Sequence, residues 1–200
     1  MGDAVRGSDG MLRCPWADST DDYRAYHDAE WGRPVHGDVA LFERITLEAF
    51  QSGLSWLTIL RKRSAFREAF EGFDPQRVAA FDDGDVERLM ADSGIVRNRR
   101  KIDATVTNAR ALVSLHESGG SLDDLVWQFA DPSRARPRNL GEVPAATPAS
   151  TALSKALKVN GFVFVGPTTM YAAMQACGLV DDHLRDCHVP RRVTDERTTD

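Results

Sequence analysis

The chain of 200 residues is long enough for one domain, or for one domain made of two small lobes, and its 42% apolar and 28% charged residues exclude wholesale disorder. No apolar run approaches the roughly 18–20 residues of a membrane helix, so we expect no membrane partner. The net charge of −5 counts against a protein that coats nucleic acid, although residues 1–90 carry −6 and residues 91–200 carry +1.

The first half of the chain reads as a series of helices, each opened by a residue that can cap free backbone amides. Proline after Asp74 supports a start there, because proline is favoured at the first helical position. The expected helices are 38–52, capped by Asp38 and stopped by Gly53; 56–63, capped by Ser55; one around Phe66 and Phe70; 76–81, opened by Asp74; and 86–90, started by Asp85.

The second half contains the clearest amphipathic helix, because Ile102, Val106, Ala109 and Val113 share one helical face between about residues 100 and 115. Further helices are expected after it. They are 125–127, after a capping box of Ser121 and Asp124; 148–160, opened by Thr147 and Pro148; and 168–176.

Only Phe162–Val165 has the composition of a strand, and a lone strand has no partner, so the predicted fold class is all-α. We expect one helical domain over residues 11–190, in which the segment 131–148 holds four of the nine prolines and could join two lobes. Residues 1–10 and 191–200 are expected to be flexible tails. The first residues lack the apolar stretch of a signal peptide, which favours a cytoplasmic protein.

Three cysteines are too few for a disulfide framework, and two of them stand near histidines. Cys14 and His27 lie towards one end of the chain; His183 and Cys187 lie towards the other, with the spacing of one helical face. Two thiolates and two imidazoles would fill the tetrahedral shell of zinc and leave no position for water, so such a zinc would be structural. Spacing alone leaves ordinary side chains as the alternative, and the other histidines are equally eligible: His36, His116 and His188.

Aromatic residues gather between positions 16 and 56, and such residues usually belong to a core. Glu48 is notable among them, because it follows Ile45 by three positions and Leu41 by seven and so shares their apolar helical face. Beside aromatic rings, a buried carboxylate could accept hydrogen bonds from a planar heterocycle. The alternative places Glu48 at a helix end, where it reaches solvent or an arginine. The aromatic residues are Trp16, Tyr23, Tyr26, Trp31 and Trp56.

The segment 89–102 reads as helix, short hairpin and helix, with Gly94 at the turn. Free backbone amides at the start of the second helix, together with the basic run Arg97–Lys101, suit a phosphate without reading base sequence. A solvated helix end is the usual alternative for such a run.

Several short segments, spread collinearly over roughly residues 12–188, match one known pattern. They are Arg13-Cys14-Pro15-Trp16, Tyr26–Gly32, Leu47-Glu48, Gln51–Trp56, Phe73-Asp74-Pro75, Gly94–Ile102, Ala152–Leu157, Gly161-Phe162, Phe164-Val165-Gly166, and Met174–Val180 with His183. Through these segments the chain resembles the bacterial 3-methyladenine DNA glycosylase I family, within the helix–hairpin–helix glycosylase superfamily.

The resemblance implies an all-helical fold with a helix–hairpin–helix at about residues 85–115. It implies that 3-methyladenine is removed from alkylated double-stranded DNA and released as the free base, and we expect a monomer. It also implies one structural zinc ion, Zn2+, held by Cys14, His27, His183 and Cys187.

The same resemblance assigns the remaining roles. Glu48 would be the catalytic residue that hydrogen-bonds the extruded base, and Trp56 would stack on that base. Trp16, Tyr23 and Tyr26 would line the pocket. The Gly53-Leu54 turn would press into the gap left in the duplex. The hairpin residues that would hold phosphates are Gly94, Arg97, Arg99, Arg100 and Lys101.

The chemistry of the lesion makes this plausible. Methylation at N3 leaves the base cationic in the nucleotide, so the base departs neutral and the glycosidic bond is already weak. Extrusion, shape selection and stabilisation of an oxocarbenium-like sugar can then supply much of the rate without a strong general acid. Many superfamily members place a catalytic aspartate downstream of the hairpin; the stretch 114–120 has none, as is general in this family, and Asp103 lies on the second helix.

Some positions depart from the family pattern. Ala49, Phe50 and Ser52 differ beside Glu48, and the ring of Phe50 could alter the pocket width. Pro148 and Thr151 differ in a later loop, to which no function is assigned.

Two other functions stay open on the sequence. One is a glycosylase/lyase in which Lys101 is the nucleophile. The other is a zinc-stapled helical DNA-binding module without catalysis. A catalytic zinc is a third idea, which four protein ligands would oppose.

Overall fold

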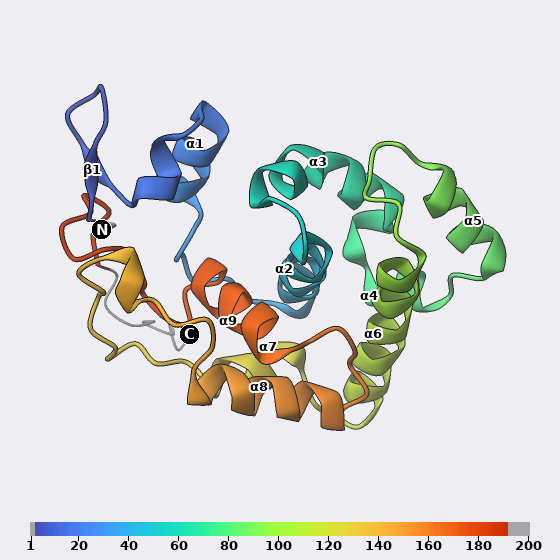
Figure 1. Ribbon diagram of the computed structural model, residues 1–200. Helices are drawn as coiled ribbons and strands as arrows, with labels where there is room; N and C mark the ends of the chain where they lie inside the picture. Colours follow the sequence, from blue (N-terminus) through green and yellow to red (C-terminus); the bar gives the residue numbers. More distant parts are fainter. Residues whose placement is uncertain (1–2, 192–200) are drawn as a thin grey trace, which may run out of the picture. The chain divides into compact units, whose positions relative to one another are not determined.

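The computed structural model describes residues 3–191 and is mainly helical, as Figure 1 shows. Within this described part the strands are only two residues long. The strand-like segment Phe162–Val165 forms no strand, and Phe164 adopts a left-handed backbone with a φ of 57°. The α-helices are α1 (Asp21–Ala29), α2 (Asp38–Gln51), α3 (Trp56–Ala69), α4 (Pro75–Ala79), α5 (Asp83–Ala91), α6 (Arg99–Glu117), α7 (Leu122–Trp127), α8 (Pro148–Val159) and α9 (Pro167–Ala176); the 3-10 helices are η1 (Pro15–Asp18), η2 (Glu71–Phe73) and η3 (Leu140–Glu142); the strands are β1 (Val5–Arg6) and β2 (Leu12–Arg13).

The described chain divides into two compact units. Unit one contains the described residues up to Val35, the segment Ala130–Ala145 and the described residues from Met174 onward. Unit two contains His36–Phe129 and Ala146–Ala173. The expected continuous domain 11–190 is therefore distributed over two units, and the proline-rich connection belongs largely to unit one.

Most of the predicted helix starts are confirmed. The side chains of Ser55, Asp74, Ser121 and Thr147 each accept a hydrogen bond from an amide two or three residues later. The helix that begins after Ser55 is longer than expected, because it continues to Ala69 and absorbs the separate helix predicted around Phe66.

Two predicted caps are wrong. Gly37 is the N-cap of α2, and the carboxylate of Asp38 instead accepts from the amides of Leu122 and Asp123 at the start of α7, at 3.0 and 2.9 Å. Asp82 is the N-cap of α5, and the carboxylate of Asp85 accepts a hydrogen bond from the Asp82 amide, which completes a capping box. Asp38 thus has its partners in another helix, whereas Asp85 lies at the third position of its own helix.

The core of unit two is rich in phenylalanine. Phe50 of α2 is fully buried, and its ring lies 4.7 Å from that of Phe66 and 6.0 Å from that of Phe70. Phe50 is therefore a core residue, and its expected effect on the width of a pocket stays a prediction. Glu43 of α2 binds Arg67 of α3 at 2.8 Å, which adds an ion pair between the helices that carry these rings.

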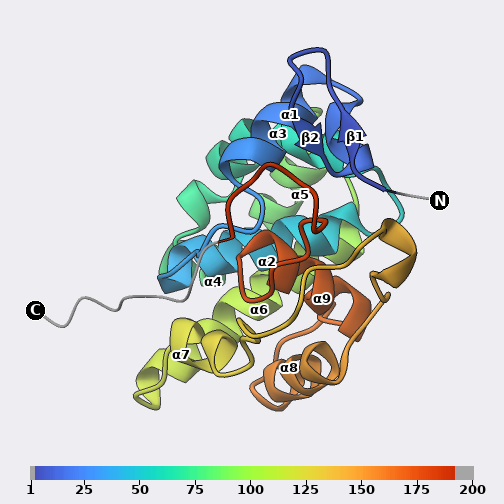
Figure 2. The ribbon, with the colours of Figure 1, turned by 90° about the vertical axis from the view of Figure 1, so that its left-hand side faces the viewer.

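Unit one begins with an ordered hairpin in which β1 pairs with β2 in antiparallel register, Val5 with Arg13 (Figure 2). Part of this hairpin lies within residues 3–10, where the sequence predicted a flexible tail; the tail expected at 191–200 lies, beyond residue 191, outside the described residues. The helix α1, which the sequence did not predict, follows the N-cap Thr20 and carries Tyr23, Tyr26 and His27.

Candidate active site and metal centre

Four cysteine and histidine side chains from distant parts of the sequence meet in unit one. Cys14 follows β2, His27 lies on α1 and Cys187 lies in the last described segment; their ligand atoms are within 4.8 Å of one another, and all three are buried. The ring of His183 lies 5.0 Å from that of His27, and its Nε2 is buried with no hydrogen-bond partner among the described residues. His183 and Cys187 belong to an irregular segment, so the predicted helical face is wrong although the two residues do converge.

Hydrogen bonds orient both imidazoles for ligation. Nδ1 of His27 bonds Asp28 at 2.8 Å, and Nδ1 of His183 bonds Asp181 at 3.1 Å. Since each Nδ1 is engaged, each Nε2 is left for a metal, which is the usual carboxylate–histidine arrangement around zinc. Gly32 makes room for this geometry, because a Cβ there would come within 2.8 Å of the His183 ring.

Two arginines support the two aspartates. Arg13 holds Asp28 through two bonds of 3.0 and 2.7 Å, and Arg136 holds Asp181 through Nε at 2.8 Å. Burial opposes the charge of Asp181, but its hydrogen bonds with His183 and Arg136 lower its pKa. Arg13, Asp28 and His27 thus form one hydrogen-bonded chain, and Arg136, Asp181 and His183 form another.

The donor set matches that of a structural zinc site. Sγ of Cys187 lies 3.5 Å from Nε2 of His27, and the amide of Leu184 donates to Sγ of Cys14 at 3.4 Å. The hydrogen bond from Cys14 lowers the pKa of the Cys187 thiol despite its burial. Two cysteine sulfurs and two imidazole nitrogens are the donor types of structural zinc sites, and those of Cys14, His27 and Cys187 lie within 4.8 Å of one another.

Aromatic rings pack around these histidines. The ring of Trp16 lies 5.2 Å from His27 and 5.1 Å from Trp31, whose own ring lies 4.6 Å from His183. Tyr23 and Tyr26 also lie beside Trp16, at 5.7 and 6.4 Å. These aromatic residues therefore form one cluster in unit one with the candidate metal ligands.

Glu48 and Trp56 belong to unit two. Glu48 lies on the buried face of α2 and is only 6% exposed, as its helical spacing predicted. Burial raises the pKa of Glu48 to about 8, although Arg44 one turn earlier favours the charged form. Trp56, half-buried, opens α3 after the turn at Gly53, whose φ of 82° suits glycine. Leu54 at this turn is 40% exposed.

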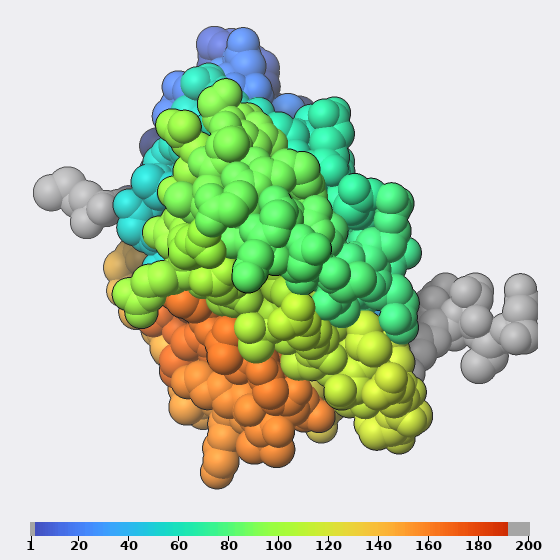
Figure 3. All heavy atoms as spheres, turned by 90° about the vertical axis from the view of Figure 1, so that its right-hand side faces the viewer, coloured from blue at the N-terminus to red at the C-terminus, as the bar shows by residue number. Residues whose placement is uncertain are grey.

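The predicted hairpin is present as residues 92–98 between α5 and α6, on the face of unit two shown in Figure 3. Gly94 is required for space, because a Cβ there would come within 3.0 Å of Ala65 and 2.9 Å of Asp92. Arg97, Arg99 and Arg100 are exposed, with Arg99 paired to Glu87.

Lys101 differs from the other basic residues of this run. It is 8% exposed, burial lowers its pKa, and its Nζ donates to the carbonyls of Phe50 and Ser52 at 2.9 and 2.6 Å. The structure thus directs the ammonium into the protein, whereas the sequence assigned it to a phosphate. Lys62 of α3, which the sequence analysis missed, donates from its Nζ to the carbonyls of Ser93 and Gly94 in the hairpin.

The supporting shell of the metal centre was also missed. Asp28 directly follows His27, and Asp181 stands two positions before His183, so carboxylates adjacent to candidate ligands were a usable signal. Arg136 offered no such signal, because it lies in a connection far from either pair.

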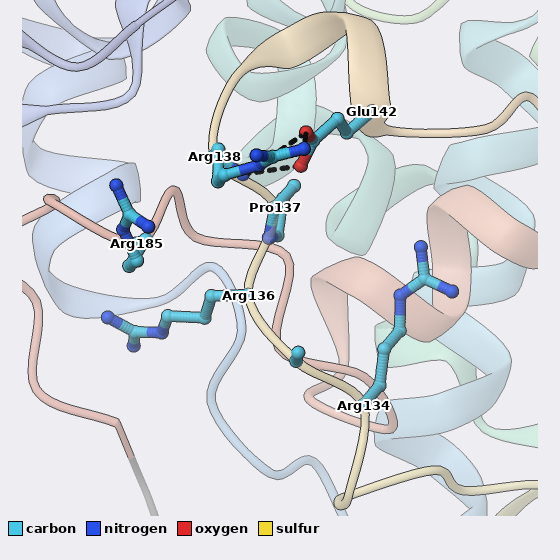
Figure 4. Close-up of a pocket in the computed structure, with 7 residues that line it drawn as sticks. Arg134, Arg136, Pro137, Arg138, Glu142 and Arg185 are labelled. Carbon is cyan, nitrogen blue, oxygen red and sulfur yellow. Dashed lines mark hydrogen bonds and ion pairs between the residues drawn. The ribbon is translucent and has the colours of Figure 1, made fainter.

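A cavity of about 410 Å³ in unit one is lined by Arg134, Arg136, Arg138 and Arg185, with Glu142 (Figure 4). Each arginine has a carboxylate partner. The pairs are Arg134 with Asp182, Arg136 with Asp181, Arg138 with Glu142, and Arg185 with Asp186. Because these charges are balanced, the cavity has no clear excess of positive charge for an anion.

None of the helices in the described part is both long and apolar enough to span a membrane.

The chain is similar to known proteins over most of its length. It is 50% identical over 179 residues to DNA-3-methyladenine glycosylase 1 of Escherichia coli, covering 88% of this chain and 96% of that protein. It is 48% identical over 177 residues to DNA-3-methyladenine glycosylase of Haemophilus influenzae, with the same coverage.

Solved structures agree. A crystal structure of 3-methyladenine DNA glycosylase I matches with a TM-score of 0.85 and 49% identity, over 88% of this chain and 98% of that one. The Staphylococcus aureus enzyme, studied for its recognition of 3-methyladenine, matches with a TM-score of 0.85 and 36% identity, over 90% of this chain and 97% of that one. Residues 16–190 match the family model of methyladenine glycosylases, so the chain belongs to the methyladenine glycosylase family and is a glycosylase, a hydrolase of N-glycosidic bonds.

Proposed function

We propose that this protein repairs alkylated double-stranded DNA by hydrolysing the N-glycosidic bond of 3-methyladenine. The observation that carries the proposal is Glu48, a buried carboxyl on α2 whose pKa is raised to about 8, close in sequence to the exposed Leu54 and the half-buried Trp56. Relatives that share about half of their residues with this chain are DNA-3-methyladenine glycosylases, which supports the same activity here.

The buried carboxyl of Glu48 suits a cationic base. Burial penalises its charged form in the free protein, and a base made cationic by methylation would offset that penalty. Unmodified adenine is neutral and offers no such compensation. Glu48 therefore favours the methylated base, and Trp56 would stack on it.

Hydrolysis then needs little acid catalysis. Water adds to the anomeric carbon, the base leaves as neutral 3-methyladenine, and the proton of the water passes to solvent. The role of the protein is to extrude the nucleotide and to stabilise the oxocarbenium-like sugar.

DNA is held, in this proposal, by the hairpin of unit two. Gly94, Arg97, Arg99 and Arg100 bind backbone phosphates, and the Gly53-Leu54 turn fills the gap that the extruded base leaves.

The four ligands of unit one would hold one structural Zn2+. Bound there, the ion would clamp segments from both ends of the sequence, because the unfolded chain has no equivalent site. Its shell would be filled by Cys14, His27, His183 and Cys187, which leaves no position for a reacting water.

Chromatography of the bases released from methylated DNA tests the activity. We expect 3-methyladenine in the product, with 3-methylguanine and 7-methylguanine as the comparison that defines the lesion range. Glu48→Gln and Trp56→Ala should each reduce release while the fold is kept. Wild-type release by both variants would contradict the base-binding assignment, and absence of any released base would favour a DNA-binding module.

A glycosylase/lyase is disfavoured by the position of Lys101, because its Nζ is buried and engaged by two carbonyls. Borohydride trapping on abasic DNA should yield no covalent adduct.

We also propose that the protein is cytoplasmic and acts as a monomer. Sedimentation with and without DNA would check the oligomeric state.

A further inference from the structure

Lys101 caps the end of α2. Its ammonium donates to the carbonyls of Phe50 and Ser52, which are among the groups that a helix C-terminus leaves without intrahelical partners. A cation at this position is also favoured by the helix dipole. The capped carbonyls immediately precede the turn at Gly53 and Leu54. That turn is closed by a hydrogen bond from the Leu54 amide to the Gln51 carbonyl at 2.7 Å.

Lys62 makes the reciprocal connection. Its Nζ donates to the carbonyls of Ser93 and Gly94, at 2.8 and 3.1 Å, at the tip of the 92–98 hairpin. Lys62 lies on α3, the helix after the 52–55 turn, and binds the hairpin. Lys101 lies on α6, the helix after the hairpin, and binds the residues before the turn.

This crossed arrangement joins two segments that the proposed function uses for different tasks. The hairpin would grip phosphates, whereas Leu54 would enter the base stack. The 52–55 turn and the 92–98 hairpin could each bend where they join their flanking helices. Lys101 of α6 holds the residues before the turn, and Lys62 of α3 holds the hairpin. The two segments should therefore move together.

We propose that Lys101 and Lys62 are positioning residues, which hold the 52–55 turn and the 92–98 hairpin as one rigid surface against duplex DNA. Phosphate binding at the hairpin then fixes where Leu54 enters the duplex. This inference rests on the proposed function. It gives Lys101 a role that acts through the protein backbone and not through a phosphate.

The salt dependence of DNA binding separates these two roles. The dissociation constant of duplex DNA with an abasic-site analogue is measured for Lys101→Met over a series of salt concentrations. We expect about tenfold weaker binding, equivalent to roughly 1.4 kcal/mol, with an unchanged slope of log affinity against log salt. A lost phosphate contact would instead reduce that slope by about 0.9.

Matched variants complete the experiment. Arg100→Met, at an exposed position in the first turn of α6, should reduce the slope, and Lys158→Met, at an exposed position of α8, should change neither affinity nor slope. Lys62→Met should resemble Lys101→Met. Affinity for free 3-methyladenine should be unchanged in both lysine variants, since a general loss of structure would weaken it too.

Three results would overturn the inference: unchanged duplex affinity in both lysine variants, a reduced slope in Lys101→Met, or equal losses for duplex and free base. If Lys101→Met does not fold, Lys101→Gln, which keeps one donor, and Lys62→Met decide the question by the same measures. Wild-type protein that releases no 3-methyladenine would contradict the proposed function, whereas the salt slopes test the lysines independently of turnover.

Discussion

Glu48 and Glu43 are both buried on α2, yet only one has a strong partner. Glu43 accepts hydrogen bonds from Arg67, whereas burial raises the pKa of Glu48 from 4.5 to about 8. The folded protein thus binds the Glu48 proton more tightly than the unfolded chain does. Stability from this group is present below pH 4.5 and is lost as the pH rises towards 8.

Glu48→Gln should therefore stabilise the free protein at alkaline pH. We expect the free energy of unfolding at pH 8 to rise by about 4 kcal/mol, with little change near pH 4.5, because glutamine mimics the protonated acid. Urea unfolding at both pH values measures this. Glu43→Gln is the control, and it should destabilise the protein at pH 8 through loss of its ion pair. A less stable Glu48→Gln at pH 8 would show that the Glu48 charge is compensated before any base binds.

Arg136 offers a second test on a single side chain. It is 10% exposed and links Asp181 to the carbonyl of Val189, so Arg136→Met should loosen the orientation of His183. We expect about 10- to 100-fold weaker zinc binding, measured by competition with a chelator. Arg138→Met, an exposed neighbour in the same connection, should retain wild-type affinity. A zinc affinity of Arg136→Met equal to that of the wild-type protein would show that Arg136 does not support the proposed metal centre.

Among the helices, caps with a local bond were predicted correctly except at α5, where Asp82 and not Asp85 is the N-cap. Ser55, Asp74, Ser121 and Thr147 each bond amides within three residues, so short-range chemistry decided the outcome. Asp38 failed because its partners lie more than 80 positions away in α7. The role of Lys101 was not predicted for the same reason. Its basic neighbours indicated a phosphate contact, whereas its carbonyl partners lie about fifty positions earlier in the sequence.

Asp38→Ala should accordingly weaken α7 more than α2. Loss of two amide bonds at the start of α7 should cost about 1 kcal/mol. Hydrogen exchange should accelerate at residues 122–127 while the interior of α2 keeps its protection. Ser121→Ala, at the local cap of α7, should produce the same pattern. Faster exchange at the start of α2 alone would mean that Asp38 caps its own helix after all.

For the whole molecule, the sequence predicted a mainly helical chain, and the cysteines and histidines that it singled out lie close together in unit one. It could not predict the division into units, because each unit is assembled from separate stretches of sequence. Nor could helical spacing explain the pairing of His183 with Cys187, whose segment is irregular. Collinear resemblance succeeded there because it reflects tertiary contacts that periodicity does not contain.

Cys187→Ser should affect the two units unequally. All four proposed ligands belong to unit one, so loss of one thiolate should lower bound zinc and reduce the protection of unit one from hydrogen exchange. Unit two contains its own phenylalanine core and should keep its protection. Cys177→Ser, at a buried cysteine outside the ligand set, is the control for metal content. Stoichiometric zinc in Cys187→Ser would refute the ligand set.

The distribution of the four ligands has a consequence for synthesis of the protein. Two donors, Cys14 and His27, leave the ribosome early, but His183 and Cys187 follow only after all of the residues His36–Phe129 have been made. Unit two can begin to fold while unit one still lacks half of its ligands. A chain whose translation stops before residue 183 cannot complete the shell, so metal retention would distinguish finished molecules from truncated ones.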